Sequence, residues 1–226
     1  MSFSPSAYLD LSQTAHAALF EGVGNVWEAL PRIAPYLKEN LKPAFHGSKL
    51  AEAYVGPQVY VGPGTIIEPG AVIKGPAWIG AECEVRAGAY IRENVIVGDG
   101  CVLGNSCEFK NAVLFNGCQV PHYTYVGDSI LGHKAHLGAG VILSNFKLAG
   151  DEVVLRHDGA LIRTGLRKFG AIVGDRVEVG CKAVLNPGSV IGRGAVLYPG
   201  VVWSGVLAEK TLVKNRPQYQ LLPVRD

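Results

Sequence analysis

Residues 55–113 have the sequence VGPQVYVGPGTIIEPGAVIKGPAWIGAECEVRAGAYIRENVIVGDGCVLGNSCEFKNAV, and one class of residue returns in it at every sixth position. Ten apolar residues hold that position without a break: Val55, Val61, Ile67, Ile73, Ile79, Val85, Ile91, Val97, Leu103 and Phe109. Four places after each of them comes a small or β-branched residue. A helix face repeats at about 3.6 residues and a strand at about 2, so a period of six indicates short strands joined by turns. The pattern is typical of a parallel β-helix built from hexapeptide repeats, which is an all-β fold.

The repeat extends beyond this stretch with small changes of register. It slips by five-residue steps to Leu114 and then to Leu131, and after a gap it resumes from Val173 to Leu197. Gly and Pro recur between the apolar positions, where turns need their backbone angles. Three hexads would close one triangular coil, and each coil would bury its neighbours. We therefore expect residues 51–205 to form the β-helix.

Three segments do not follow the hexad. Residues 1–50 show short helical patterns, and we expect them to form a helical cap over the open end of the prism. Residues 148–168 interrupt the repeat, and Asp158-Gly159 between two apolar runs predicts a hairpin there. Residues 206–226 leave the hexad and are expected to form a C-terminal tail that packs along the prism or on a neighbouring subunit.

Composition excludes several classes of protein. A net charge of +2 over 226 residues, without a basic tract, argues against nucleic-acid binding. No apolar run approaches the ~18 residues that span a membrane, and the first residues lack a secretion signal. Four of the five cysteines occupy small-residue hexad positions, which indicates packed thiols in a reducing compartment. We expect a cytoplasmic protein.

Two polar runs, residues 104–111 and 121–128, are unusually rich in reactive side chains. Singly, His122 and Lys110 would be ordinary residues of a solvated wall. Together they lie about two hexads apart on adjoining faces, close enough to line one groove with a base and a cation. This pairing favours a catalytic site over a bare wall.

Both runs resemble motifs of one family. Asn105, Glu108 and Lys110 match a Gly-Asn-x-x-Glu-x-Lys run, and residues 122–128 (HYTYVGD) match a His-Leu-Thr-Tyr-Leu-Gly-Asp run. Residues 137–140 (LGAG) and 216–218 (RPQ) continue the match in the same order. From about residue 92 to 218 the chain resembles the acetyltransferase half of the bifunctional bacterial N-acetylglucosamine-1-phosphate uridyltransferase, and its archaeal sugar-nucleotidyltransferase relatives.

The resemblance implies a left-handed β-helix, a homotrimer with grooves between neighbours, and transfer of an acetyl group from acetyl-CoA to an amino-sugar phosphate. It implies that His122 is the general base, a role suited to a side chain that exchanges protons near neutral pH. It also implies two binding sets. The substrate set is Arg92, Lys110, Tyr125, His136 and Lys168, and the coenzyme set is Ala139, Asn145, Phe146, Cys181, Pro199 and Arg216.

Some features depart from the family and leave alternatives open. His136 stands where the family has an asparagine, and Cys181 where it has a serine. The nucleotidyltransferase half has no counterpart in these 226 residues, so we expect no uridylyl transfer. One alternative is an acyltransferase for another sugar, and a second is a scaffold without catalysis. The third is a zinc enzyme similar to γ-class carbonic anhydrases, but the spacings of His122, His133 and His136 do not fit that pattern, and we expect no metal.

Overall fold

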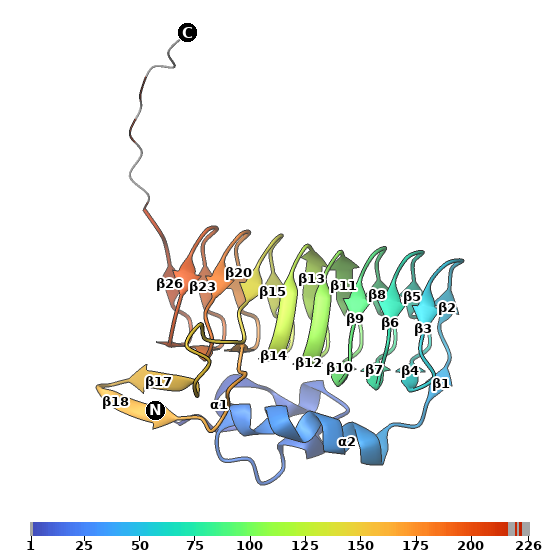
Figure 1. Cartoon of the computed structure of the whole chain (residues 1–226), viewed down its shortest axis with the longest axis horizontal. Helices are drawn as coiled ribbons and strands as arrows, with labels where there is room; N and C mark the ends of the chain where they lie inside the picture. The colour runs from blue at the N-terminus through green and yellow to red at the C-terminus, as the bar shows by residue number, and fades with distance from the viewer. Residues whose placement is uncertain (1, 217–219, 221, 223–226) are drawn as a thin grey trace.

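The computed structural model describes residues 2–216, 220 and 222. It shows an elongated prism of short parallel strands, with helical segments along one flank (Figure 1). This confirms the predicted parallel β-helix. The left-handed winding stays a prediction. Among the described residues, no helix has the length and apolar character needed to cross a membrane.

Each of the first eight coils of the prism adds one strand to each of three faces, and the last coil adds strands to two of them within the described residues. The third face is a separate nine-stranded sheet with one strand per coil, so the described residues form nine coils. Its strands are β2 (Ser48–Lys49), β5 (Ile66–Ile67), β8 (Glu84–Val85), β11 (Val102–Asn105), β13 (Gln119–His122), β15 (His136–Leu137), β20 (Glu178–Val179), β23 (Val196–Leu197) and β26 (Leu212–Val213).

The first and second faces belong to one 15-stranded sheet. The first face holds β3 (Tyr54–Val55), β6 (Val72–Ile73), β9 (Tyr90–Ile91), β16 (Ile142–Leu143), β21 (Val184–Leu185) and β24 (Val202–Trp203). The second holds β1 (Ala44–Phe45), β4 (Val59–Val61), β7 (Ala77–Ile79), β10 (Val95–Val97), β19 (Ala171–Val173), β22 (Ser189–Ile191) and β25 (Val206–Leu207). Two longer strands, β12 (Glu108–Leu114) and β14 (Tyr125–Leu131), run across both faces.

The interior of the prism is the stack of hexad residues. From Val61 to Phe109 every sixth residue is fully buried, as the repeat predicts. Neighbouring coils hydrogen-bond as parallel strands, about 4.8 Å apart. Because each coil covers the next, the stack stabilises the prism along its whole length.

The five-residue slips correspond to shortened corners between the first and second faces. Ile91 pairs with Phe109 and Val95 pairs with Ala112, so three residues turn this corner in one coil and two residues in the next. The shortened corners place Asn111 and Asp128 at φ values of 47° and 46°. Asn and Asp are the residues, other than glycine, that best tolerate this left-handed conformation.

The N-terminal helical segments are α1 (Pro5–Tyr8), η1 (Leu11–Gln13), η2 (Ala17–Phe20), η3 (Val26–Arg32) and α2 (Ile33–Asn40). They pack on the outer side of the second face, where Trp27 and Leu30 share a buried cluster with Ile96 and Ile130. They therefore cover a flank, where we expected a cap over the open end. The reason is that strands such as β10 are apolar on both sides and need cover. The first coil already begins at Ala44, inside the segment that we assigned to the cap.

The hairpin predicted at residues 148–168 is confirmed. Strands β17 (Val154–His157) and β18 (Ala160–Arg163) pair antiparallel around Asp158-Gly159, both with positive φ. Val153 and Leu155 bury their side chains in the same cluster as the N-terminal segments. The insertion and the N-terminal segments thus form one layer on the flank (Figure 1).

The C-terminal boundary at residue 206 was wrong. Strand β25 pairs with β22, and β26 pairs with β23, so the prism continues to Val213. The hexad is hidden here because Trp203 and Leu207, the inward residues of successive faces, are only four positions apart. Pro217 and Gln218, which belong to the family resemblance, lie outside the described residues.

Candidate functional site

Six predicted site residues line one pocket of about 370 Å³. It lies on the first face, beside the corner with the second face. Its lining is Arg92, Lys110, Tyr125, Asn145, Phe146 and Lys168. Four of these come from the predicted substrate set and two from the coenzyme set. We refer to this cavity as the Lys110 pocket.

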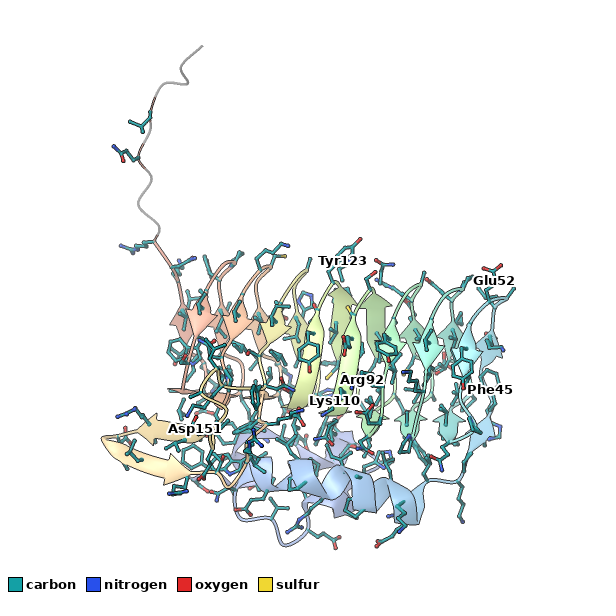
Figure 2. All side chains as sticks on the ribbon, in the orientation of Figure 1. Phe45, Glu52, Arg92, Lys110, Tyr123 and Asp151 are labelled. Carbon is teal, nitrogen blue, oxygen red and sulfur yellow. The ribbon has the colours of Figure 1, made fainter. Side chains whose placement is uncertain are left out.

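Strand register brings the first cations together. Ile91 pairs with Phe109, so Arg92 and Lys110, one position further on, stand in neighbouring coils. Figure 2 shows both side chains on this part of the prism. In the next coil Lys110 pairs with Gly127. The backbone positions of Arg92 and Lys110 are therefore about one strand spacing apart, and the next coil places a glycine beside Lys110.

Gly127 makes room for the polar side chains of the pocket. A β-carbon at this position would collide with the Tyr125 hydroxyl and would come within 2.8 Å of the Asn145 amide nitrogen. In the space left free, the Asn145 amide donates a hydrogen bond of 3.1 Å to the Tyr125 hydroxyl. Burial raises the pKa of Tyr125, and the charges of Asp128 and Glu108 add to the effect. The phenol therefore remains protonated at neutral pH and can donate a hydrogen bond to a ligand.

The cations of the pocket differ in their partners. Arg92 pairs with Glu108 at 3.0 Å and with Glu93 at 3.5 Å. Lys110 lies 3.6 Å from Asp128. Lys168 is exposed at the rim. Because no acidic residue belongs to the lining and the ion pairs of Arg92 are partly exposed and therefore weak, the pocket suits an anionic group such as a phosphate.

The insertion supplies the remaining wall. Phe146 and Lys168 form an antiparallel bridge at its base, so the chain leaves the prism and returns at one point. The Arg167 guanidinium lies 5.7 Å from the centre of the Phe146 ring. Lys168, at the end of the insertion, therefore lies next to Phe146 at its start and lines the Lys110 pocket.

Four further predicted residues form a column on another edge of the prism. His136 pairs with Gln119 and with Glu178, and Glu178 pairs with Val196, so residues three positions further on also stack. Those residues are His122, Ala139, Cys181 and Pro199, which we call the His122 column. Backbone hydrogen bonds of 2.9–3.0 Å from Gly140, Lys182 and Gly200 to the carbonyls of the preceding coil hold this edge.

The His122 column borders the first face on the side of the third face. His122 is exposed and is not part of the lining of the Lys110 pocket. Figure 2 shows its neighbour Tyr123 at the edge of the prism, away from Arg92 and Lys110. The two groups of site residues therefore flank the same face from opposite sides in one chain.

The other predicted residues lie apart from both groups or at their margin. His136 lies on the third face, where its Nδ1 is 2.7 Å from a carboxylate oxygen of Glu178. Arg216 follows the last strand and is exposed, next to the coil position that continues the His122 column.

The three histidines of the zinc alternative do not meet. His133 lies before the third-face strand β15, His136 lies on it, and His122 lies at the end of β13. Nδ1 of His133 is 2.7 Å from the Asn116 carbonyl oxygen. Within the described part of the chain, no three His, Cys, Asp or Glu residues are grouped as metal ligands.

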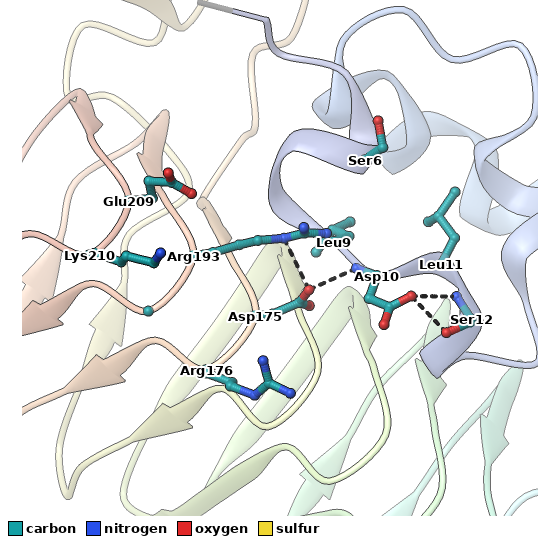
Figure 3. Close-up of a pocket in the computed structure, with 11 residues that line it drawn as sticks. Ser6, Leu9, Asp10, Leu11, Ser12, Asp175, Arg176, Arg193, Glu209 and Lys210 are labelled. Carbon is teal, nitrogen blue, oxygen red and sulfur yellow. Dashed lines mark hydrogen bonds and ion pairs between the residues drawn. The ribbon is translucent and has the colours of Figure 1, made fainter.

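A larger cavity of about 700 Å³ lies between the N-terminal segment and the last coils (Figure 3). None of the predicted site residues lines it. Its buried carboxylate, Asp175, accepts hydrogen bonds from the backbone N–H groups of Asp10 and His133, both at 2.8 Å, and lies 3.2 Å from Nε of Arg193. These contacts attach the N-terminal segment to a corner of the prism.

Sequence reasoning assigned no role to Gly127, Asn111 or Asp128. The signal for two of them was present, because Asn111 and Asp128 lie at the two five-residue slips. What the sequence could not show is that both slips occur at one corner, beside the insertion.

The fold and the pocket define a hexapeptide-repeat β-solenoid with a polar, cationic site on one face. A family model described as the GMPPB C-terminal domain matches residues 73–166. The bifunctional sugar-1-phosphate nucleotidylyltransferase/acetyltransferase of Sulfurisphaera tokodaii is 38% identical over 93 residues, which is 41% of this chain and 23% of that protein. The bifunctional protein GlmU of Methanococcus vannielii is 33% identical over 88 residues, 39% of this chain and 21% of that protein.

An uncharacterized acetyltransferase of Escherichia coli, YaiX, is 35% identical over 93 residues, 41% of this chain and 40% of that protein. The chain thus spans less than half the length of these curated relatives. The resemblance to sugar-phosphate nucleotidyltransferase/acetyltransferase proteins is confirmed over the matched segment.

Solved structures show a weaker likeness. The UDP-N-acetylglucosamine acyltransferase of Arabidopsis superposes with a TM-score of 0.41 at 14% identity, over 76% of this chain and 70% of that chain. PerB of Caulobacter crescentus, solved with CoA and GDP-perosamine, gives a TM-score of 0.21 at 19% identity, over 74% of this chain and 54% of that chain.

Proposed function

We propose that this chain is an N-acetyltransferase that moves the acetyl group of acetyl-CoA to the amino group of a sugar phosphate similar to glucosamine 1-phosphate. The observation that supports this most is the Lys110 pocket, where Arg92, Lys110 and Lys168 gather beside the hydroxyl of Tyr125. Cations of this kind bind a phosphate, Arg through a planar fork and Lys as a point charge. The relatives named as acetyltransferases support the reaction type.

In the proposed reaction the substrate amine arrives as an ammonium and must lose a proton. The imidazole of His122 accepts it, the amine nitrogen attacks the thioester carbonyl, and a tetrahedral oxyanion forms. The carbon–sulfur bond then breaks, and the coenzyme leaves as a thiol after protonation. General-base catalysis of this type contributes about 10²- to 10⁴-fold.

The coenzyme is assigned to the edge beside His122. Ala139, Cys181 and Pro199 succeed one another there with small side chains, which leaves space for an extended chain along the prism. Arg216 at the end of the column is exposed and is suited to a phosphate of the coenzyme. Asn145 and Phe146, which the resemblance assigns to the coenzyme, would contact the ligand from the Lys110 pocket.

A homotrimer would complete this site. The Lys110 pocket and the His122 column flank the first face, and a second copy packed on that face would enclose the groove between them. Outward residues of the first face support such packing, since Tyr54, Ile142 and Val202 are apolar and at least 37% exposed. Five free cysteines, four of them buried, fit the cytoplasmic location that we propose.

Thiol release from acetyl-CoA tests the reaction. We expect release with glucosamine 1-phosphate, and an N-acetylated product by mass spectrometry. Glucose 1-phosphate is the control, because it has the phosphate but no amine. Release with glucose 1-phosphate at the same rate, or no release with any amino-sugar phosphate, would contradict the proposal; the second outcome would favour a scaffold.

A further inference from the structure

Asp128 is a nearly buried carboxylate directly behind the Lys110 pocket. It is 5% exposed and does not belong to the lining. It occupies the shortened corner of β14, where its φ of 46° turns the chain from the first face to the second. A buried carboxylate is costly unless hydrogen bonds or cations compensate for the lost water. The groups that compensate the Asp128 carboxylate therefore show which parts of the site it positions.

Three side chains of the site region converge on the Asp128 carboxylate. The Asn145 amide donates to it at 2.5 Å and the Asn111 amide at 2.9 Å, while the Lys110 ammonium lies 3.6 Å away. Two of the three, Lys110 and Asn145, line the pocket. Because the Asn145 amide also donates to Tyr125, the carboxylate fixes the hydroxyl of Tyr125 through one intermediate.

The backbone of Asp128 holds a further part of the site. Its carbonyl oxygen accepts a hydrogen bond of 2.8 Å from the Gly170 N–H group, two residues after Lys168. One residue is therefore tied to Lys110, to Asn145 and to the end of the insertion that carries Lys168.

We infer that Asp128 is a positioning residue, which orients Lys110 for the phosphate and, through Asn145, the Tyr125 hydroxyl for the sugar. The inference rests on the proposed function. Its physical basis is that a carboxylate only accepts hydrogen bonds, so it directs both amide N–H groups and the ammonium toward one point. An asparagine at position 128 would turn one NH₂ group toward these donors and would remove the charge opposite Lys110.

Asp128→Asn compared with Asp175→Asn tests this role. Asp175 is a matched control, because it is 6% exposed, accepts two backbone hydrogen bonds and pairs with Arg193 (Figure 3). It does not line the Lys110 pocket. Both variants lose a buried carboxylate, so both should unfold at lower urea concentration. Only Asp128→Asn should raise the KM for the amino-sugar phosphate, by about tenfold or more, because ground-state binding geometry is lost.

A double-mutant cycle separates positioning from a general loss of stability. In a Lys110→Ala background, Asp128→Asn should raise KM much less than in the wild type, since the two residues act through one contact. Should Asp128→Asn fail to fold, Asn111→Gly removes one donor at a position whose φ of 47° suits glycine, and it should raise KM by a smaller factor.

Three outcomes are distinct. Inactive wild-type protein would defeat the proposed function itself. If the wild type is active and folded Asp128→Asn has an unchanged KM, the positioning role alone is overturned. The same holds for an unchanged KM in Asn111→Gly, if that variant has to replace Asp128→Asn. Equal KM increases in Asp128→Asn and Asp175→Asn, or additive effects in the cycle, would show that Asp128 is structural.

Discussion

At the scale of residues, the site is a cluster of polar side chains held by strand register. The family resemblance predicted Arg92, Lys110, Tyr125 and Lys168 as substrate-binding residues, and the structure brings these four into one pocket. Gly127 could not be predicted in the same way, because its role depends on which side chains fold back over it from its own coil and from the next. The sequence was enough to predict which residues belong to the candidate site. It was not enough to predict their contacts, because these depend on how the coils stack.

Lys110→Ala should raise the KM for the sugar phosphate while changing kcat little. A phosphate contact is made in the ground state and in the transition state alike, so its loss weakens binding in both. Lys74→Ala is the matched control: Ile73 pairs with Ile91, so Lys74 stands one coil from Arg92, but it lies outside the pocket. Steady-state kinetics on both variants check this. A normal KM for Lys110→Ala, or an equal increase for Lys74→Ala, would exclude a phosphate contact at Lys110.

His16 should make folding stability sensitive to acid. The ring is buried between Tyr36 and Trp78, and its Nδ1 is 3.1 Å from the Tyr36 hydroxyl. Burial lowers the pKa of His16 from 6.5 to about 4, although the charge of Asp99 opposes the shift. Between these values the unfolded chain binds more protons, so the free energy of unfolding should fall by up to about 3 kcal/mol as the pH drops from 6.5 to 4.

Urea unfolding as a function of pH measures this effect. His16→Gln removes the titrating group and should flatten the curve in that window, whatever its stability at neutral pH. An unchanged slope in the variant would assign the acid sensitivity to other groups.

At the scale of elements, the hexad predicted the prism, and departures from the hexad lie beside the candidate site. Two shortened corners and the insertion follow one another along the corner between the first and second faces, with Asn111, Asp128 and Asn145 in successive coils. The sequence showed each departure singly but not their common location. The last coil was not predicted, because a step of four residues before Leu207 breaks the hexad although the coil itself continues.

Leu155→Ala should loosen the insertion and weaken the site together. Leu155 is 2% exposed and packs in the flank cluster, and Leu161 on the partner strand of the same hairpin is 61% exposed. Truncation of a buried leucine costs about 2–5 kcal/mol, while Leu161→Ala should stay within about 0.5 kcal/mol of the wild type. Denaturant unfolding compares the two. Similar small losses in both variants would show that the insertion is not anchored by this cluster.

At the scale of the whole molecule, one side of the prism is covered by the chain itself and the first face is left open. The second face carries the N-terminal segments and the insertion, whereas apolar residues of the first face, including Ile142 and Val202, remain exposed. Which faces a chain covers was not predictable from the hexad, since the repeat treats all three alike. The candidate site lies beside this open first face.

The proposed trimer should depend on that open face. Sedimentation should give three times the 24.0 kDa mass of the chain, and Val202→Asp should shift it toward the monomer because a charge would be buried in the contact. Leu161→Asp, on the exposed hairpin, should leave the trimer intact. A wild type that sediments as a monomer at micromolar concentration would contradict the assembly and the shared groove.

We propose that His122 accepts a proton from the ammonium group of an amino-sugar phosphate, whose nitrogen then takes the acetyl group from acetyl-CoA. The most direct test is kcat for His122→Ala with glucosamine 1-phosphate and acetyl-CoA, measured on protein shown to keep its melting temperature. We expect kcat to fall by at least about 10²-fold with little change in KM, because proton acceptance matters mainly in the transition state. Folded His122→Ala with the full wild-type kcat would contradict it.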